Sequence, residues 1–282
     1  MPIRTGLGLI YTLRLMNPRS VVRNLWRERE LILQLASRDV TSRYKGSYLG
    51  LLWSLLNPVL MLTIYTFVFG VLFKARWGLE GEGRLEFALV LFSGLIIFGL
   101  FSECANRAPS LIVSAPQYVK KVQFPLQVLP VVSTLSALAH ASISLVVLVI
   151  GLWLGMGLVH WTIVWLPLVV LPLLLLSVGL GWLLSALGVF LRDISQMTGI
   201  ATTAMLFLSP IFYPVSRIPE QLRPYYAINP LSVIIEQTRR VLIWGTSPDW
   251  LALSIVTVST GLLALAGFAW FQRTRRGFAD VM

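Results

Sequence analysis

The sequence predicts an all-α membrane protein with six transmembrane helices, an N-terminal amphipathic interface helix, and short re-entrant outer gate helices between spans five and six. Two observations predict this class. Of the 282 residues, 56% are hydrophobic and only 12% are charged, which is about half the charged share of an ordinary soluble domain. The apolar residues also gather in uncharged runs close to the roughly 20 residues that a membrane-spanning helix needs.

The predicted spans follow these runs in chain order: residues 51–73, 87–102, 126–154, 163–191, 199–213 and 250–271. The second run is long enough only if Glu103 to Ala105 lie at a membrane edge. The fifth is short and meets Pro210 and Pro214, each of which lacks an N–H and disfavours helix in the preceding residue. We therefore expect the fifth span to end near the outer boundary of the membrane.

Basic residues fix the orientation of this map. With six spans, sixteen of the 23 Lys and Arg residues lie on the side that holds both termini, nine of them before the first span. The positive-inside rule then predicts two cytoplasmic termini. The chain divides into a cytoplasmic N-terminal segment (1–49), a six-span domain (50–272) and a cytoplasmic tail (273–282). Because topology accounts for the net charge of +11, we expect no nucleic-acid partner.

Several chemistries lack the residues that they need. One Cys and two His are too few for a thiolate or His-rich metal centre. His140, in span three, is expected to be a packing residue rather than a proton relay, and Glu103 with Arg107 a surface pair. The scattered carboxylates argue against a polytopic transferase, and no G-x-x-x-x-G-K-[ST] loop is present to hold ATP. We expect no catalytic, cofactor-binding or metal-binding residue in this chain.

The segment before the first span has helical amphipathic spacing. Its polar residues recur every three or four positions, and an apolar stripe formed by Ile32, Leu33, Ala36 and Val40 lies opposite. Such a helix lies in the plane of the membrane interface, where its cationic charge also suits anionic lipid. The polar positions are Arg27, Glu30, Gln34, Arg38, Thr41 and Lys45.

The run RDVTSRYKGSYLGLLWSLLNP at 38–58, followed by Tyr65 and residues 67–70, resembles the start of the permease subunits of type-2 ABC exporters that move lipid-linked O-antigen and teichoic-acid polysaccharides. The stretch LSPIFYP at 208–214, continuing through residues 218–219, 229–231 and 236–241, resembles the same family around span five. The resemblance covers residues 25–272. It implies a homodimeric, non-enzymatic transport subunit in the bacterial inner membrane, paired with two copies of a separate ATPase that binds ATP and Mg.

The resemblance also implies roles for particular residues. The loop 108–125 would be a coupling segment that docks in a groove of the ATPase, with the interface helix as a second contact; the alternative is a solvated basic loop. The coupling residues implied are Tyr118, Lys120, Lys121 and Phe124 in the loop, and Arg38, Arg43 and Lys45 in the helix.

The outer segment 214–249 is too apolar for a free loop. Asn229 can cap a helix that has Pro230 at its first position. Leu231, Ile234, Ile235 and Val241 would then line one face, opposite Ser232, Glu236, Arg239 and Arg240, with Glu236 paired to Arg240. Non-helical backbone at membrane depth survives only beside protein or water, so residues 209–219 should border the conduit. The resemblance likewise places short gate helices here.

Aromatic residues in spans one and five suggest the lining of a conduit, because a sugar can stack its C–H face on a ring. The alternative is that these rings anchor at the membrane interface or fill helix contacts. The predicted conduit residues are Trp53, Tyr65, Phe69, Phe207, Phe212 and Tyr213.

The function expected from the resemblance is export of O-antigen-type polysaccharide during lipopolysaccharide biosynthesis. Alternatives are a capsule or teichoic-acid exporter, a small-lipid or drug exporter of the same architecture, and a polytopic lipid-sugar enzyme.

Overall fold

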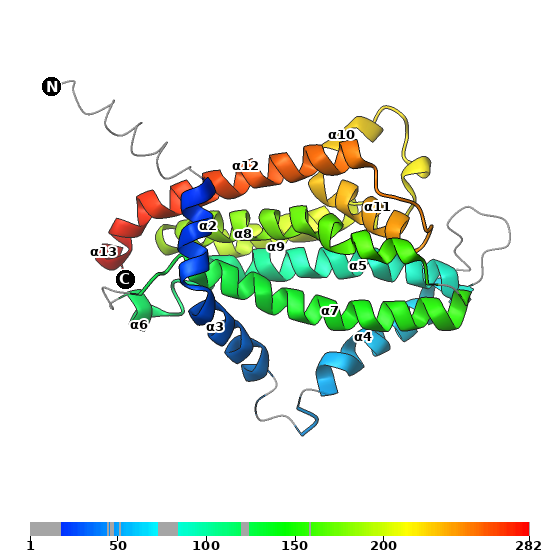
Figure 1. Cartoon of the computed structure of the whole chain (residues 1–282), viewed down its shortest axis with the longest axis horizontal. Coiled ribbons are helices and arrows are strands. Elements are labelled where there is room, and N and C mark those ends of the chain that lie inside the picture. Colours follow the sequence, from blue (N-terminus) through cyan, green and yellow to red (C-terminus); the bar gives the residue numbers. More distant parts are fainter. Residues whose placement is uncertain are drawn as a thin grey trace.

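The computed structural model describes residues 18–43, 45, 48–50, 52–72, 84–119, 124–157 and 159–281. These residues contain many helices and no strand. Among them, five helices are long and apolar enough to cross a membrane, which confirms the all-α membrane class (Figure 1). The five are Leu52–Phe69, Glu86–Ser110, Val128–Met156, Trp161–Phe190 and Trp250–Gly277.

The predicted fifth span corresponds to a shorter apolar helix, α9 (Ile194–Leu208). Its 15 residues reach only about 22 Å, against a hydrocarbon core of roughly 30 Å. The predicted bounds of 199–213 were wrong at both ends. The helix begins at Ile194 and stops at Leu208, because Pro210 excludes helical backbone at Ser209, which is extended.

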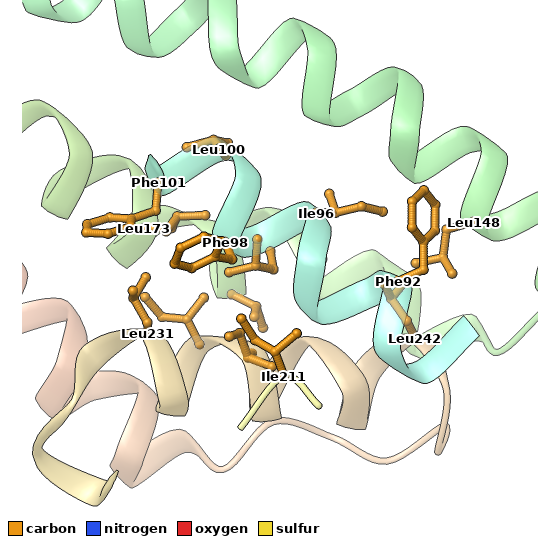
Figure 2. Packing of buried hydrophobic residues seen from close by; sticks show 14 of the residues in the cluster. Phe92, Ile96, Phe98, Leu100, Phe101, Leu148, Leu173, Ile211, Leu231 and Leu242 are labelled. Atoms are coloured by element: carbon orange, nitrogen blue, oxygen red, sulfur yellow. The ribbon is translucent and has the colours of Figure 1, made fainter. Parts of the chain in front are cut away.

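Helix α5 (Arg84–Arg107) is the centre of the bundle. In the most apolar stretch of Glu86–Ser110, 72% of the residues are buried. The helix can be buried in this way because it is hydrophobic on every side. Figure 2 shows Phe92, Ile96 and Leu100 of α5 among side chains from the surrounding helices. The helices packed on α5 include α7 (Val128–Met156), α8 (Leu166–Phe190) and α11 (Pro230–Leu242).

Helix α4 (Leu52–Tyr65) continues into a π-helical segment, η1 (Thr66–Leu72). Only 6% of the apolar stretch Leu52–Phe69 is buried. Leu62, Tyr65 and Phe69 pack partly against the core, but many other hydrophobic side chains of this helix are exposed in a single chain. Such a helix needs lipid or another protein surface to cover it. π-helical segments are uncommon and often mark functional sites, and here the segment carries Phe69.

The predicted interface helix is two helices, α2 (Pro18–Arg27) and α3 (Arg29–Ser42), separated at Glu28. Figure 1 shows them at the end of the bundle that also holds α6 and α13, which we call the α6 end; the opposite end is the α11 end. Ile32 and Ala36 are buried against α7, as the apolar stripe predicted. Leu33 of the same stripe does not join this contact, and 62% of it is exposed in the protein alone.

The last long helix is α12 (Trp250–Thr274), and η5 (Arg275–Gly277) and α13 (Phe278–Val281) follow it. The remaining short elements are η2 (Ala108–Ser110), α6 (Pro116–Val119), η3 (Trp161–Trp165), η4 (Val215–Arg217) and α10 (Arg223–Ile228).

Helices α8 and α12 approach closely because small residues meet at their crossing. A Cβ on Gly179 would lie 2.7 Å from the Ala264 Cα, and a Cβ on Gly267 would overlap the Gly179 carbonyl. Small residues commonly allow this backbone approach between membrane helices.

We predict that Gly267→Ala lowers the free energy of unfolding by about 1–3 kcal/mol, since the added methyl must push the two backbones apart. Gly261→Ala on the same helix is the matched control, because its Cβ would meet only Leu175 Cδ1 at 3.9 Å. Thermal unfolding of the detergent-solubilised protein checks both. Equal stability of the two variants would contradict the packing described.

Candidate functional site

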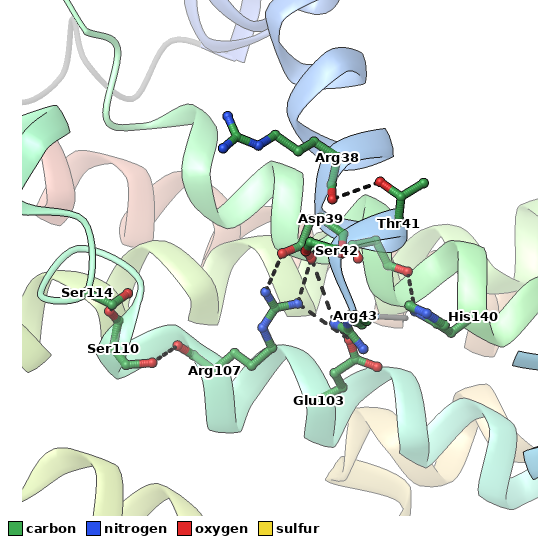
Figure 3. A network of polar contacts seen from close by, with 11 residues as sticks. Arg38, Asp39, Thr41, Ser42, Arg43, Glu103, Arg107, Ser110, Ser114 and His140 are labelled. Carbon is green, nitrogen blue, oxygen red and sulfur yellow. Dashed lines mark hydrogen bonds and ion pairs between the residues drawn. The ribbon is translucent and has the colours of Figure 1, made fainter. Parts of the chain in front are cut away.

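Four charged side chains join α3 to α5 at the α6 end of the bundle (Figure 3). Arg107 donates hydrogen bonds of 2.9 and 2.8 Å to the two carboxylate oxygens of Asp39. Arg43 pairs with Glu103 and lies 3.8 Å from Asp39. Glu103 and Arg107 were predicted as a surface pair. Although they do lie 3.7 Å apart, they bind the interface helix to the central span, which sequence spacing alone did not indicate.

The charged neighbours of Asp39 favour the ionised form of its carboxylate. Burial of this carboxyl raises its pKa, but the hydrogen bonds from Arg107 and the charges of Arg107 and Arg43 outweigh burial and lower the pKa overall. Asp39 therefore stays ionised at neutral pH. Of the three basic residues implied to contact an ATPase from the interface helix, Arg43 is engaged in this cluster, whereas Arg38 and Lys45 are exposed.

The predicted coupling segment begins directly after Arg107. Ile112 is fully buried, in an apolar cluster with residues of α8, α12 and α13. Tyr118 and Phe124 are half-buried and stack on each other, with ring centroids 4.3 Å apart and planes 15° apart. The stack joins the two described sides of the segment. The other two predicted coupling residues, Lys120 and Lys121, lie outside the described residues.

At the α11 end, α11 is a helix that begins at Pro230, where the sequence predicts a helix start. Asn229 caps it by accepting a hydrogen bond of 3.0 Å from the Leu231 N–H. The predicted apolar face, Leu231, Ile234, Ile235 and Val241, is buried.

The prediction for the polar face of α11 was wrong in two respects, burial and pairing. Arg239 has no exposed surface, and Ser232 is buried as well. Glu236, predicted to pair with Arg240, lies 3.9 Å from Arg239, while Arg240 Nε donates to the Ser247 carbonyl. Helical spacing alone could not reveal a partner outside the helix.

Arg239 satisfies the irregular backbone beside it. Its guanidinium donates to the carbonyls of Val90 at 3.3 Å, Pro210 at 2.6 Å and Ile211 at 3.0 Å. The Pro210 and Ile211 carbonyls lie in the proline-rich segment, residues 209–219, and the Val90 carbonyl lies in α5. Because irregular carbonyls away from water must find donors, Arg239 fixes the segment against the central helix. Gly94 leaves room for it, as a Cβ there would lie 2.9 Å from Arg239 Nη2.

Four of the six predicted conduit residues come together beside this segment. The ring centroid of Phe212 lies 6.2 Å from that of Phe69 and 6.0 Å from that of Phe207. The Tyr213 hydroxyl donates to the Phe207 carbonyl at 2.5 Å. Two members were missed by sequence analysis: Phe87, 5.9 Å from Phe69, and Tyr226, whose hydroxyl lies 2.8 Å from that of Tyr213. Both lie on other parts of the chain than their partners, and helical spacing does not indicate such pairs.

The other two predicted conduit residues lie elsewhere. Tyr65 lines a pocket of about 410 Å³ between α4, α5 and α7, together with Asn57, Glu103 and His140. His140 Nδ1 also lies 2.9 Å from the Ser136 carbonyl, one turn earlier. Trp53 sits near the start of α4, a span away from the aromatic cluster, and is 37% exposed.

Comparison with known proteins gives one family match and several relatives. The model of the ABC-2 type transporter family matches residues 30–243. The O-antigen export system permease protein RfbA of Myxococcus xanthus is 29% identical, over 92% of this chain and 98% of that protein. A Klebsiella pneumoniae protein of the same name is 26% identical over 90% and 95%. The polysialic acid transport protein KpsM of Escherichia coli is 24% identical over 84% and 90%.

We predict that Arg239→Ala destabilises the protein by about 3 kcal/mol or more, because the Pro210 and Ile211 carbonyls lose this donor, whereas the Val90 carbonyl keeps a hydrogen bond from Ser93 Oγ. Arg217→Ala is the control, since that exposed side chain carries the same charge in the same outer segment. Unfolding in denaturant, followed by tryptophan fluorescence, measures the difference. An Arg239→Ala protein as stable as the control would show that these carbonyls do not need the guanidinium.

Proposed function

Because the chain belongs to the ABC-2 type transporter family, we propose that it is the transmembrane permease subunit of an ATP-driven exporter of lipid-linked, O-antigen-type polysaccharide across the bacterial inner membrane. One observation carries this proposal. The relatives are named for O-antigen export or polysialic acid transport, and they align along 84% to 92% of the chain.

The energy source would be a separate subunit. The sequence has no phosphate-binding loop of the G-x-x-x-x-G-K-[ST] type, so two copies of a partner ATPase would bind ATP and Mg, and this chain would hold no cofactor. A second copy of the permease would complete the conduit. The exposed apolar faces of α4 and α9 support this pairing, because neither face is covered within one chain.

We propose six spans with both termini in the cytoplasm. Helix α9 would be the short fifth span, and α10 and α11 would be re-entrant gate helices that do not cross. The distribution of basic residues supports this orientation, with sixteen of 23 on the side of the termini. Helices α2 and α3 would lie along the cytoplasmic interface, where anionic lipid complements their arginines.

Helix α5 would transmit the motion. One end is bound to the interface helix through Arg107 and Asp39. The other end reaches the gate through the hydrogen bond between Arg239 and the Val90 carbonyl. These two points are about 25 Å apart along one continuous helix. When ATP closes the two ATPases, a shift of α3 and the coupling segment would therefore move the gate segment as well.

The aromatic cluster would provide the surface along which the glycan slides. Phe69, Phe207 and Phe212 offer ring faces to sugar C–H groups, and such contacts do not require one pattern of hydroxyls. Many different repeat units could then pass through the same conduit.

Capsular polysaccharide is the second candidate substrate, favoured by the similarity to the polysialic acid transport protein. Teichoic acid, and a small lipid or drug, remain further substrates that the same architecture would suit. Reconstitution of the permease with its ATPase in proteoliposomes tests the proposal directly. ATP-dependent transfer of lipid-linked polysaccharide to the lumen is expected, and a complex that moves only small lipids would overturn it.

We predict that the triple variant Tyr118→Ala, Lys120→Ala, Lys121→Ala reduces ATP-dependent export by about tenfold, the effect of losing ~1.4 kcal/mol of docking energy. Less ATPase should also co-purify with it. Arg217→Ala, which removes a basic side chain in the proposed outer segment, is the control and should export normally. Unchanged co-purification and export in the triple variant would refute docking through this segment.

We also predict that Phe212→Ala slows export by about three- to tenfold, because the glycan loses a stacking surface worth roughly 1 kcal/mol. Phe212→Tyr keeps the ring and should restore the rate. Tyr65→Ala tests whether the 410 Å³ pocket belongs to the same path. Trp161→Ala is the control for an exposed aromatic outside the cluster. If Phe212→Ala and Tyr65→Ala both preserve export and glycan-stimulated ATP hydrolysis, the proposal of an aromatic conduit is wrong.

A further inference from the structure

The chain does not end in a free tail after its last span. Helix α13 folds back against the bundle, and Phe278 is fully buried. Its ring lies 5.5 Å from that of Phe271 in α12 and 5.9 Å from that of Phe190 in α8. The turn between α12 and α13 therefore has a fixed position at the α6 end of the bundle, where the coupling segment also lies (Figure 1).

Arg275, in this turn, reaches the point where the coupling segment returns to the bundle. Its Nη1 donates to Gln127 Oε1 at 3.1 Å, and its Nη2 donates to the Phe124 carbonyl at 3.2 Å. The Gln127 carbonyl in turn accepts a hydrogen bond of 2.9 Å from Trp182 Nε1 of α8. Arg275 after α12 and Trp182 of α8 thus both hold the C-terminal end of the coupling segment, at Phe124 and Gln127. Only a guanidinium offers two fixed donors at this separation, which a lysine ammonium does not.

The entry of the segment is held independently. Arg107 is bound to Asp39 of α3. Two residues later, Pro109 packs so closely on Gly188 of α8 that a Cβ on Gly188 would overlap the Pro109 carbonyl. Between the two ends, Ile112 lies in the same apolar cluster as Phe271 and Phe278. Arg275 is therefore the polar connection between the end of α12 and the exit of the segment.

We propose that Arg275 is a positioning residue, which through Gln127 and Phe124 makes the coupling segment and the end of α12 move as one unit. Its role is to keep the conversion of ATP hydrolysis into transport efficient, rather than to contact the ATPase itself. This deepens the proposed export function and rests on it, but the positioning can be measured in the permease alone.

The first measurement uses the isolated permease. A nitroxide is placed on the exposed α6 residue Gln117 in a Cys104→Ser background, and its mobility is recorded by electron paramagnetic resonance. Arg275→Ala should increase the mobility of the label. Arg273→Ala is the matched control, because it removes the same charge from an exposed position two residues earlier and should leave the spectrum unchanged.

The second measurement uses the complete complex with its ATPase in proteoliposomes. Arg275→Ala should lower the polysaccharide exported per ATP hydrolysed by about three- to tenfold, without reducing the amount of ATPase that co-purifies. Arg275→Lys should give an intermediate ratio, since its single ammonium nitrogen keeps the charge but cannot reproduce the two separated donors of the guanidinium. Gln127→Leu is the second variant, which leaves Arg275 in place and should change both readouts in the same direction but less.

The two measurements separate the possible failures. An unchanged spectrum in Arg275→Ala and Gln127→Leu, or an equal change in Arg273→Ala, overturns the positioning role even if the complex exports polysaccharide. A normal export ratio in Arg275→Ala overturns the functional part of the proposal. If the wild-type complex moves no polysaccharide, the proposed export function fails, and the spectra still decide whether Arg275 holds the segment.

Discussion

The need to satisfy backbone carbonyls away from water shapes the α11 end of this molecule. The prolines of the segment after α9 end that helix and leave carbonyls without helical partners. A single buried guanidinium, that of Arg239, supplies donors to two of them and to a carbonyl of α5. Since a buried guanidinium is costly unless its donors are used, the segment, α11 and the central helix depend on one another. The aromatic cluster owes its geometry to this arrangement, because Phe212 directly follows Ile211.

The central helix gives the two functional regions a common frame. At the α6 end, Arg107 and Glu103 bind the interface helix, and the coupling segment starts where α5 ends. At the α11 end, Val90 of the same helix accepts from Arg239. A helix whose sides are almost all buried cannot shift without displacing its neighbours, since interiors are close-packed. This rigidity would let the two ends of the helix move together, as the proposed coupling requires.

Sequence reasoning succeeded where the signal is local and failed where the partner is distant. The length of the uncharged apolar runs located the long helices. The Asn229-Pro230 pair located the start of α11, because capping involves adjacent residues. Period alone placed Arg239 and Ser232 on a polar face, although both are buried. Each error concerns which surface a residue meets after folding. The same limit applies to Phe87 and Tyr226, whose aromatic partners lie on other elements.

The sequence by itself determined that this is a helical membrane protein, roughly where its helices run, and which family it resembles. Apolar length, charge distribution and short ordered motifs can all be read along the chain without knowing its path. Only the tertiary structure decided that Asp39 and Arg107 meet, that Arg239 is the buried donor to the gate segment, and that Arg275 closes the coupling segment. Those contacts join residues from 28 to 151 positions apart, and no periodic pattern encodes which distant carbonyl a given side chain will reach.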